Sequence, residues 1–147
     1  MKRYFPFALV LMILAGLTGS RVAAQTVSGQ RALADIPFAF NVGKKSLPAG
    51  KYTVRIVNPS SDQKVIQINA LDGGTSVLVQ TIGVEVDADE DARLVFHRYG
   101  DRYFFNQVHL SGASTSLATV QSEAEKAERK ALTRTKIKKS VVVVVFE

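Results

Sequence analysis

Short segments in which apolar and polar residues alternate most restrict the fold of this 147-residue chain. From Ile36 to Val42 every second residue is large and apolar. Successive side chains of a strand point to opposite sides, so this period of two is typical of a strand with one buried face. Similar segments recur over residues 51–57 and 64–71, whereas residues 76–86 are apolar on both faces, which predicts a central strand. The sequence therefore predicts a mainly β domain.

The clearest single element is a hairpin around Gly100-Asp101. Glycine in the first position suits a tight two-residue turn, because it adopts a positive φ without strain. The register set by this turn pairs Tyr99 with Arg102 and Phe96 with Phe105. Both faces of the hairpin are partly apolar, which predicts that other elements pack on each side.

The pattern changes towards the end of the chain. Ser122-Glu123-Ala124-Glu125 is typical of a capping box, so a helix is predicted over about 122–134. Three alanines spaced along it would let this helix lie close to another surface. Residues 140–146 (SVVVVVF) are β-branched and predict a last strand. Burial of this strand is favoured over an exposed edge, because an exposed apolar edge invites pairing with other chains.

Together these segments predict an antiparallel β-sandwich of about six to eight strands, with one C-terminal helix and a final valine-rich strand. The single domain covers residues 35–147, and the small polar residues 25–34 precede it as a loose leader. The chain contains no cysteine, so packing rather than disulfides must hold the fold.

The first 24 residues have the three-part layout of a secretory signal peptide. Lys2 and Arg3 give a basic start, an apolar run follows from Ala8 to Leu17, and small residues precede Gln25. The apolar run is too short to cross a bilayer, which takes about 20 residues. The sequence thus predicts an exported protein, periplasmic or extracellular, with no membrane-spanning segment after cleavage of the leader.

The formal net charge of +6 is concentrated at the two ends of the chain. Lys2, Arg3 and Arg21 lie in the predicted leader, so the mature chain carries +3. Residues 25–122 hold nine basic and nine acidic residues, and the basic excess lies in residues 123–139. A nucleic-acid-binding protein needs a basic face with stacking aromatics, and this basic segment has no aromatic residue. A nucleic-acid partner is therefore not expected.

Three parts of the sequence resemble a known group of proteins. They are Asp35-Ile36-Pro37-Phe38-Ala39-Phe40-Asn41-Val42-Gly43, Leu47-Pro48-Ala49-Gly50-Lys51-Tyr52-Thr53-Val54, and Lys126-Ala127-Glu128-Arg129 after Tyr103-Phe104-Phe105. In these segments the chain is similar to small exported β-domain proteins of unknown function, which occur in several copies in some soil bacteria, notably Acidobacteria. The resemblance covers most of the mature chain. It implies an exported β-sandwich-like domain with a late helix, and it implies no activity.

Tyr99 and Phe104, beside His97 and Arg102, are the best candidates for a ligand-binding surface, because aromatic rings offer large contact areas. The alternative is that this face packs under the C-terminal helix, and the apolar area of the rings favours that alternative. By their offsets from the turn, His97 and His109 fall on opposite faces of the hairpin. A metal ion shared by the two histidines is therefore not expected.

Asp87, Asp89 and Asp91 alternate along an acidic run and are candidate metal ligands, because calcium prefers clustered oxygen atoms. The run departs from the calcium-loop pattern at Ala92, where glycine is needed, and at Arg98, where a bidentate glutamate is needed. A solvated loop is the favoured interpretation, and no cofactor other than calcium is suggested.

The sequence has no nucleophile elbow, phosphate-binding loop or thiolate metal site, so an enzyme is not expected. We expect a non-enzymatic interaction or structural domain of the cell envelope or medium, with an unknown envelope or extracellular partner. The alternatives are a carbohydrate- or small-ligand-binding module and, less favoured, an enzyme.

Overall fold

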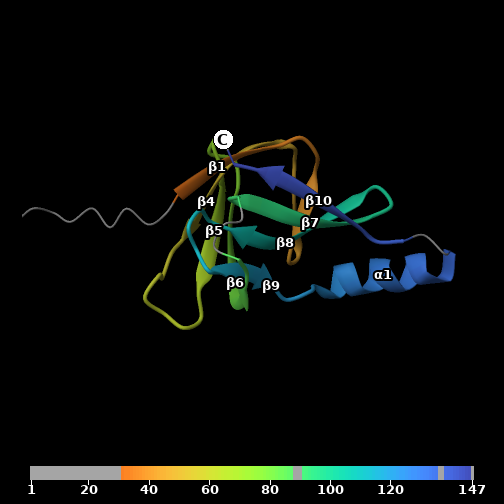
Figure 1. Ribbon diagram of the computed structural model, residues 1–147. Helices are drawn as coiled ribbons and strands as arrows, with labels where there is room; N and C mark the ends of the chain where they lie inside the picture. Colours follow the sequence, from red (N-terminus) through yellow and green to blue (C-terminus); the bar gives the residue numbers. More distant parts are fainter. Residues whose placement is uncertain (1–30, 88–90, 136–137, 147) are drawn as a thin grey trace, which may run out of the picture.

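The computed structural model describes residues 31–87, 91–135 and 138–146, which form ten strands and one helix (Figure 1). The first strands are β1 (Arg31–Ile36), β2 (Phe40–Val42), β3 (Lys45–Leu47), β4 (Gly50–Ile56), β5 (Val65–Ala70) and β6 (Ser76–Glu85). They are followed by β7 (Arg93–Tyr99), β8 (Arg102–His109), β9 (Thr115–Thr119), α1 (Glu123–Thr135) and β10 (Ser140–Val145). The predicted mainly β fold with a late helix and a final strand is confirmed.

The strands form one sheet of mixed orientation, which does not close on itself within the described residues. Neighbouring strands follow the order β1-β4-β5-β6-β9-β8-β2-β3, while β7 pairs with β8 and β10 pairs with β7. The pair of β2 and β8 is parallel, and the other pairs of described strands are antiparallel. The sheet is thus mainly antiparallel, as predicted, and the parallel pair was not foreseen, because alternation along a strand carries no information about the direction of its neighbour.

Strand β6 joins the two halves of the sheet. Its residues 76–80 pair with β5, whereas residues 81–85 pair with β9. At the changeover the backbone N–H and the hydroxyl of Thr81 both donate to the carbonyl oxygen of Lys64, at 2.9 and 2.8 Å. One hydrophobic core draws on both halves, and Ile68 of β5 and Leu94 of β7 are each 1% exposed within it.

Aromatic rings fill the centre of this core. Phe40 and Phe96 are fully buried, and their ring centroids lie 5.3 Å apart in an edge-to-face arrangement. Tyr52 of β4 also packs edge-on against Phe40 at 5.2 Å, and Phe38 stacks on Tyr103 at 3.9 Å. These contacts connect the short strand β2 to both halves of the sheet. Ring pairs of this kind stabilise a fold by more than their buried area alone contributes.

The predicted strand over residues 36–42 is split in two. Strand β1 ends at Ile36 and β2 begins at Phe40, because Pro37 lacks the N–H that a sheet ladder needs. Residues 31–34, predicted as part of a loose leader, instead pair with β4 in strand β1. Ala34 is fully buried there. The prediction missed this strand because alanine contributes only a weak apolar signal.

Near its turn the β7–β8 hairpin has the predicted register. Farther from the turn a β-bulge shifts the pairing, so that Val95 lies opposite Gln107 and Asn106 is the extra residue. The bulge returns Val108, which is 1% exposed, to the core side that Phe105 also faces. Strict alternation would have placed these two apolar residues on opposite faces.

The bulge also corrects the predicted placement of the two histidines. Beyond the bulge His109 lies opposite Arg93, on the same side of the hairpin as His97. The prediction of opposite faces is wrong, because it assumed an uninterrupted period of two. The side chains still lie apart, since the four positions from residue 93 to residue 97 span about 13 Å of strand.

Strand β10 pairs with β7 alone among the described strands and forms an edge of the sheet. Val142 and Val144 pack against the core, whereas Val141, Val143 and Val145 are 57, 49 and 62% exposed. The favoured prediction of a buried last strand is therefore wrong, and the exposed-edge alternative is correct. Only one side of a strand in this position meets the core.

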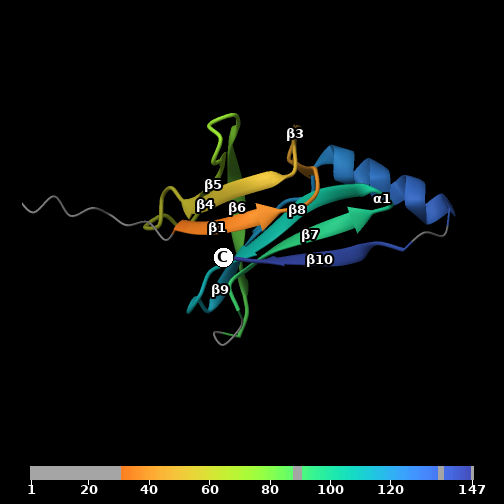
Figure 2. The same cartoon turned by 90° about the horizontal axis from the view of Figure 1, so that it is seen from above.

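Helix α1 lies at one end of the sheet in both views (Figures 1 and 2). Its three spaced alanines are exposed, so the predicted contact through small residues is wrong. The less exposed side of α1 instead carries Glu125, Glu128 and Leu132, which are spaced at helical intervals of three and four. In the part of the chain that the structure describes, no helix has the length and apolar character needed to cross a membrane.

Candidate functional site

The structure brings the four predicted ligand-binding residues together on one face at the tip of the β7–β8 hairpin. Tyr99 and Phe104 pack edge-on with ring centroids 5.8 Å apart, and each is 2% exposed. The guanidinium of Arg102 lies 5.5 Å from the centre of the Phe104 ring and pairs with Glu128 of α1. The rings are packed beneath α1, as the alternative interpretation predicted, and do not present a flat surface to a sugar.

Glu125 of α1 is the centre of this cluster, and it was not among the predicted site residues. One oxygen of its carboxylate accepts hydrogen bonds from Nδ1 of His97 at 2.7 Å, the hydroxyl of Tyr99 at 3.1 Å and Nε2 of Gln121 at 3.2 Å. The hydroxyl of Ser122 accepts a hydrogen bond from the backbone N–H of Glu125, at 3.1 Å. The capping-box pattern correctly predicted this helix start, but the Glu125 carboxylate binds the sheet and is 3% exposed.

Tyr99 donates to Glu125 as a neutral phenol. Burial is the main cause that raises the pKa of Tyr99 to about 12, and the charge of Glu125 acts in the same direction, whereas Arg129 opposes it. Among the described residues, no buried polar side-chain atom lacks a hydrogen-bond partner. The donors and acceptors of the cluster therefore bond to one another, and their arrangement holds α1 on the hairpin.

Of the three predicted metal ligands, two lie in the described part of the chain. Asp87 follows β6 and Asp91 precedes β7, and both are exposed, while Asp89 lies outside the described residues. His109 is fully buried, with its Nδ1 atom 3.0 Å from the hydroxyl of Ser116. Within residues 31–87, 91–135 and 138–146, no three histidine, aspartate or glutamate side chains lie close enough to hold a metal ion.

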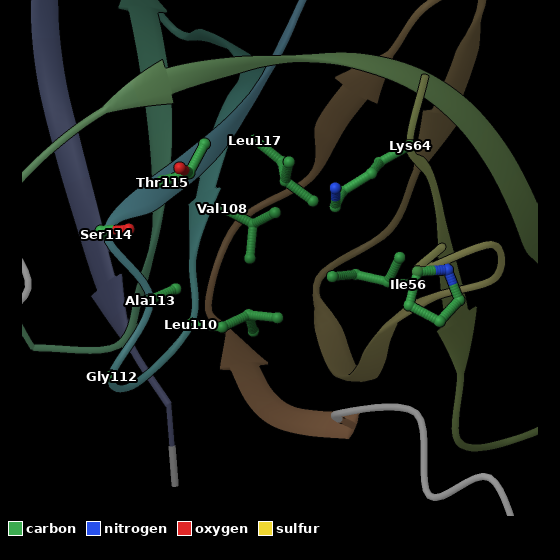
Figure 3. Close-up of a pocket in the computed structure, with 10 residues that line it drawn as sticks. Ile56, Lys64, Val108, Leu110, Gly112, Ala113, Ser114, Thr115 and Leu117 are labelled. Atoms are coloured by element: carbon green, nitrogen blue, oxygen red, sulfur yellow. The ribbon is translucent and has the colours of Figure 1, made fainter. Parts of the chain in front are cut away.

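A pocket of about 420 Å³ opens where β8 leads into β9, at the end of these strands away from the hairpin tip. Its walls include Ile56 of β4, Val108 of β8 and Leu117 of β9, and Lys64 ahead of β5 reaches into it (Figure 3). Sequence reasoning missed this pocket because its residues come from separate strands and loops, and no local pattern connects them.

A second feature is an apolar surface on the side of the sheet that faces away from the core. The outer apolar surface, as we name it, comprises residues that are 39 to 62% exposed, namely Ile82, Val84, Val141, Val143 and Val145. The pairing registers align one row of residues across five strands, namely Val143, Val95, Gln107, Ala118 and Ile82. The exposed apolar residues lie at the two ends of this row, on β10 and β6, because Ala118 is 8% exposed and Gln107 is polar. Exposed apolar side chains grouped along a strand mark a candidate interface.

The pocket and the outer apolar surface are thus two described features with the chemistry of a binding site. The Glu125 cluster instead has a structural role, since it holds α1 on the hairpin. Both features combine residues that lie far apart in the sequence. Comparisons of the chain with protein-family models, with curated proteins and with solved structures find no match.

Proposed function

We propose that this protein is an exported, non-enzymatic interaction domain of the cell envelope or medium, and that it associates through the outer apolar surface. The observation that carries the proposal is the exposure of Val141, Val143 and Val145, 49 to 62%, on a strand that pairs with β7 alone in the described chain. Removing apolar surface from water is favourable by about 25 cal/mol per Å². Covering these side chains therefore favours association.

A second copy of the chain is the partner that fits this surface. Lys139 precedes β10 near the hairpin tip, whereas Asp87 follows β6 at the diagonally opposite corner of the sheet. A two-fold axis that lies in the surface, across this diagonal, brings each basic corner against the acidic corner of the other copy. Two-fold contacts use the same patch on both copies, so the outer apolar surface of one copy then meets that of the other and opposite charges meet at both corners.

Export is part of the proposal and is supported by the layout of residues 1–24, which is that of a secretory signal peptide. The resemblance to small exported β-domain proteins agrees with it. N-terminal sequencing of the protein from the periplasm or medium of its host should find a chain that begins near Gln25. A sandwich-like packing of the two halves of the sheet belongs to the same proposal, and the core that they share supports it.

Sedimentation velocity over a wide concentration range tests the association. We expect the wild type to dimerise and the triple variant Val141→Thr, Val143→Thr, Val145→Thr to remain a monomer, because threonine keeps the β-branched shape and adds a hydroxyl. Leu78→Thr is the matched control, since Leu78 is 63% exposed on the half of β6 that pairs with β5. This control should still dimerise. A wild type that stays monomeric at millimolar concentration would refute the self-association.

The charged corners offer an independent test. Lys139→Glu should weaken the dimer, because it places like charges at both corners. Adding Asp87→Lys to the same chain should restore part of the affinity, because the signs at the corners are then exchanged. Equal dissociation constants for the wild type and Lys139→Glu would rule out this arrangement of the two copies.

A further inference from the structure

We propose that the pocket between the β4–β5 loop and the β8–β9 turn binds a small amphipathic anion, a carboxylate with a linear apolar tail. Figure 3 shows the side chains of Ile56, Val108, Leu110 and Leu117 directed toward one another around the pocket, with the amino group of Lys64 among them. Ligand sites typically combine apolar walls with a few polar groups that set orientation, and this pocket has that composition.

The apolar wall is an opening of the hydrophobic core. Val108, Leu110 and Leu117 are 1, 7 and 5% exposed and belong to the core cluster, and Ile56 packs against it. The pocket is therefore walled by core side chains that are themselves almost entirely out of water. An apolar tail that enters the pocket would leave water and contact these side chains, which is the main contribution expected for a tail.

Lys64 supplies the charge. Its backbone carbonyl accepts two hydrogen bonds from Thr81, which hold the residue beside the pocket. Its amino group lies 3.4 Å from the carbonyl oxygen of Ser61, and no described carboxylate forms an ion pair with it. The cationic amino group lies in a half-buried site beside apolar walls, so it favours an anionic group of the ligand at that position. Hydrogen bonds between charged groups are stronger than those between neutral groups.

The opposite side of the pocket mouth carries hydroxyl groups. Thr115 and Ser114 line the pocket, and Thr115 shares the core side of β9 with Leu117, two positions along the strand. A hydroxyl can donate to the second oxygen of a carboxylate. Glu85 lies opposite Thr115 in the pairing of β6 and β9 and is exposed, so its charge opposes an anion at this rim.

The size of the pocket restricts the tail. At about 30 Å³ for a group the size of a water molecule, 420 Å³ accommodates roughly 14 heavy atoms. This volume suits a medium-chain fatty carboxylate. Decanoate is accordingly the probe, and decanol is its uncharged counterpart.

Isothermal titration of decanoate and decanol below their aggregation limits tests the proposal. We expect saturable binding of decanoate to the wild type, about tenfold weaker binding to Lys64→Met, and tighter binding to Glu85→Gln. Decanol should bind the wild type and Lys64→Met equally, because methionine keeps the length of the side chain without its charge. Lys130→Met, a change on exposed α1 surface, is the control and should bind decanoate like the wild type.

Two outcomes would overturn the inference. A folded wild type that shows no saturable binding of decanoate has no such site, and equal affinity in Lys64→Met would mean that Lys64 does not recognise the carboxylate. The test is independent of self-association, because the pocket lies on the core side of the sheet and the outer apolar surface on the other side. The triple threonine variant should therefore bind decanoate like the wild type.

Discussion

Replacing Glu125 with alanine should detach α1 from the sheet and leave the sheet folded. The carboxylate accepts hydrogen bonds from His97, Tyr99 and Gln121. By contrast, the hydrophobic core of the described chain contains no residue of α1. Because polar contacts of its first two turns hold the helix, their loss should act locally.

The magnitude follows from these three bonds. A hydrogen bond to a charged group contributes a net of about 1.5–3 kcal/mol. Bonds that share one acceptor are not additive, and water replaces part of each bond when α1 separates from the sheet. We therefore expect the three bonds to contribute about 3 kcal/mol to the free energy that holds α1 on the sheet. At about 1.4 kcal/mol for each factor of ten, this lowers the protection of the α1 amides against hydrogen exchange roughly a hundredfold.

Native-state hydrogen exchange measured by NMR separates this local effect from global unfolding. The amides of α1 should lose protection in Glu125→Ala, while those of β5 keep theirs. Glu123→Ala is the control, because Glu123 lies in the same turn of α1 but its side chain is 86% exposed and pairs with Lys126. A surface pair of this kind contributes about 0–1 kcal/mol. Equal protection of α1 in both variants, or a parallel loss in β5, would refute the reasoning.

Two further changes test the hairpin. Raising the pH from 10 to 12 should destabilise the protein. The pKa of the Tyr99 phenol is 10.0 in the unfolded chain and about 12 in the folded protein, so its contribution to stability is complete below pH 10 and is lost progressively between pH 10 and pH 12. Ultraviolet titration of the wild type against Tyr99→Phe identifies this late phenol, and ionisation at its ordinary value would contradict the buried hydrogen bond. Deleting Asn106 should preserve the cooperative thermal transition seen by circular dichroism, because Asn106 is the extra residue of the bulge and without it Val108 still lies opposite Leu94 on the core side. Deletion of Gln67 is the contrast and should abolish the transition, because it puts the buried Ile66 and Ile68 on opposite faces of β5. An Asn106 deletion that no longer melts cooperatively would contradict the assignment of Asn106 as a residue outside the register.

Features with a strong local signal were predictable from the sequence. The capping serine Ser122 stands at the start of α1, and Gly100 has the positive φ, +60°, that its place in the hairpin turn predicted. Ile66 and Ile68 face the core as their alternation indicated. Each of these depends on a few neighbouring residues, whose backbone preferences and side-chain periods act over short distances.

Two of the failed predictions share one physical cause, which is an interruption or weakness of the period. Strand β1 was missed because Ala34 contributes little apolar signal although it is fully buried. The two histidines were predicted on opposite faces but lie on the same one, because Asn106 adds one residue to β8. In the candidate site, the turn register was enough to predict that Tyr99 and Phe104 lie together. The hydrogen bonds that hold α1 over them could not be predicted in this way, because α1 lies more than 20 residues later in the sequence.

By itself, the sequence determined a mainly β chain with a late capped helix and a valine-rich last strand, because period, turn chemistry and capping are local properties. The tertiary structure decided which side chains those elements bury. The valines of β10 stand at an edge, so three of the five face solvent despite their apolar character. Glu125 is charged in a helix and yet buried, because His97 and Tyr99 donate to it from 28 and 26 positions away. Burial and pairing depend on which strands lie side by side, and no local pattern contains that information.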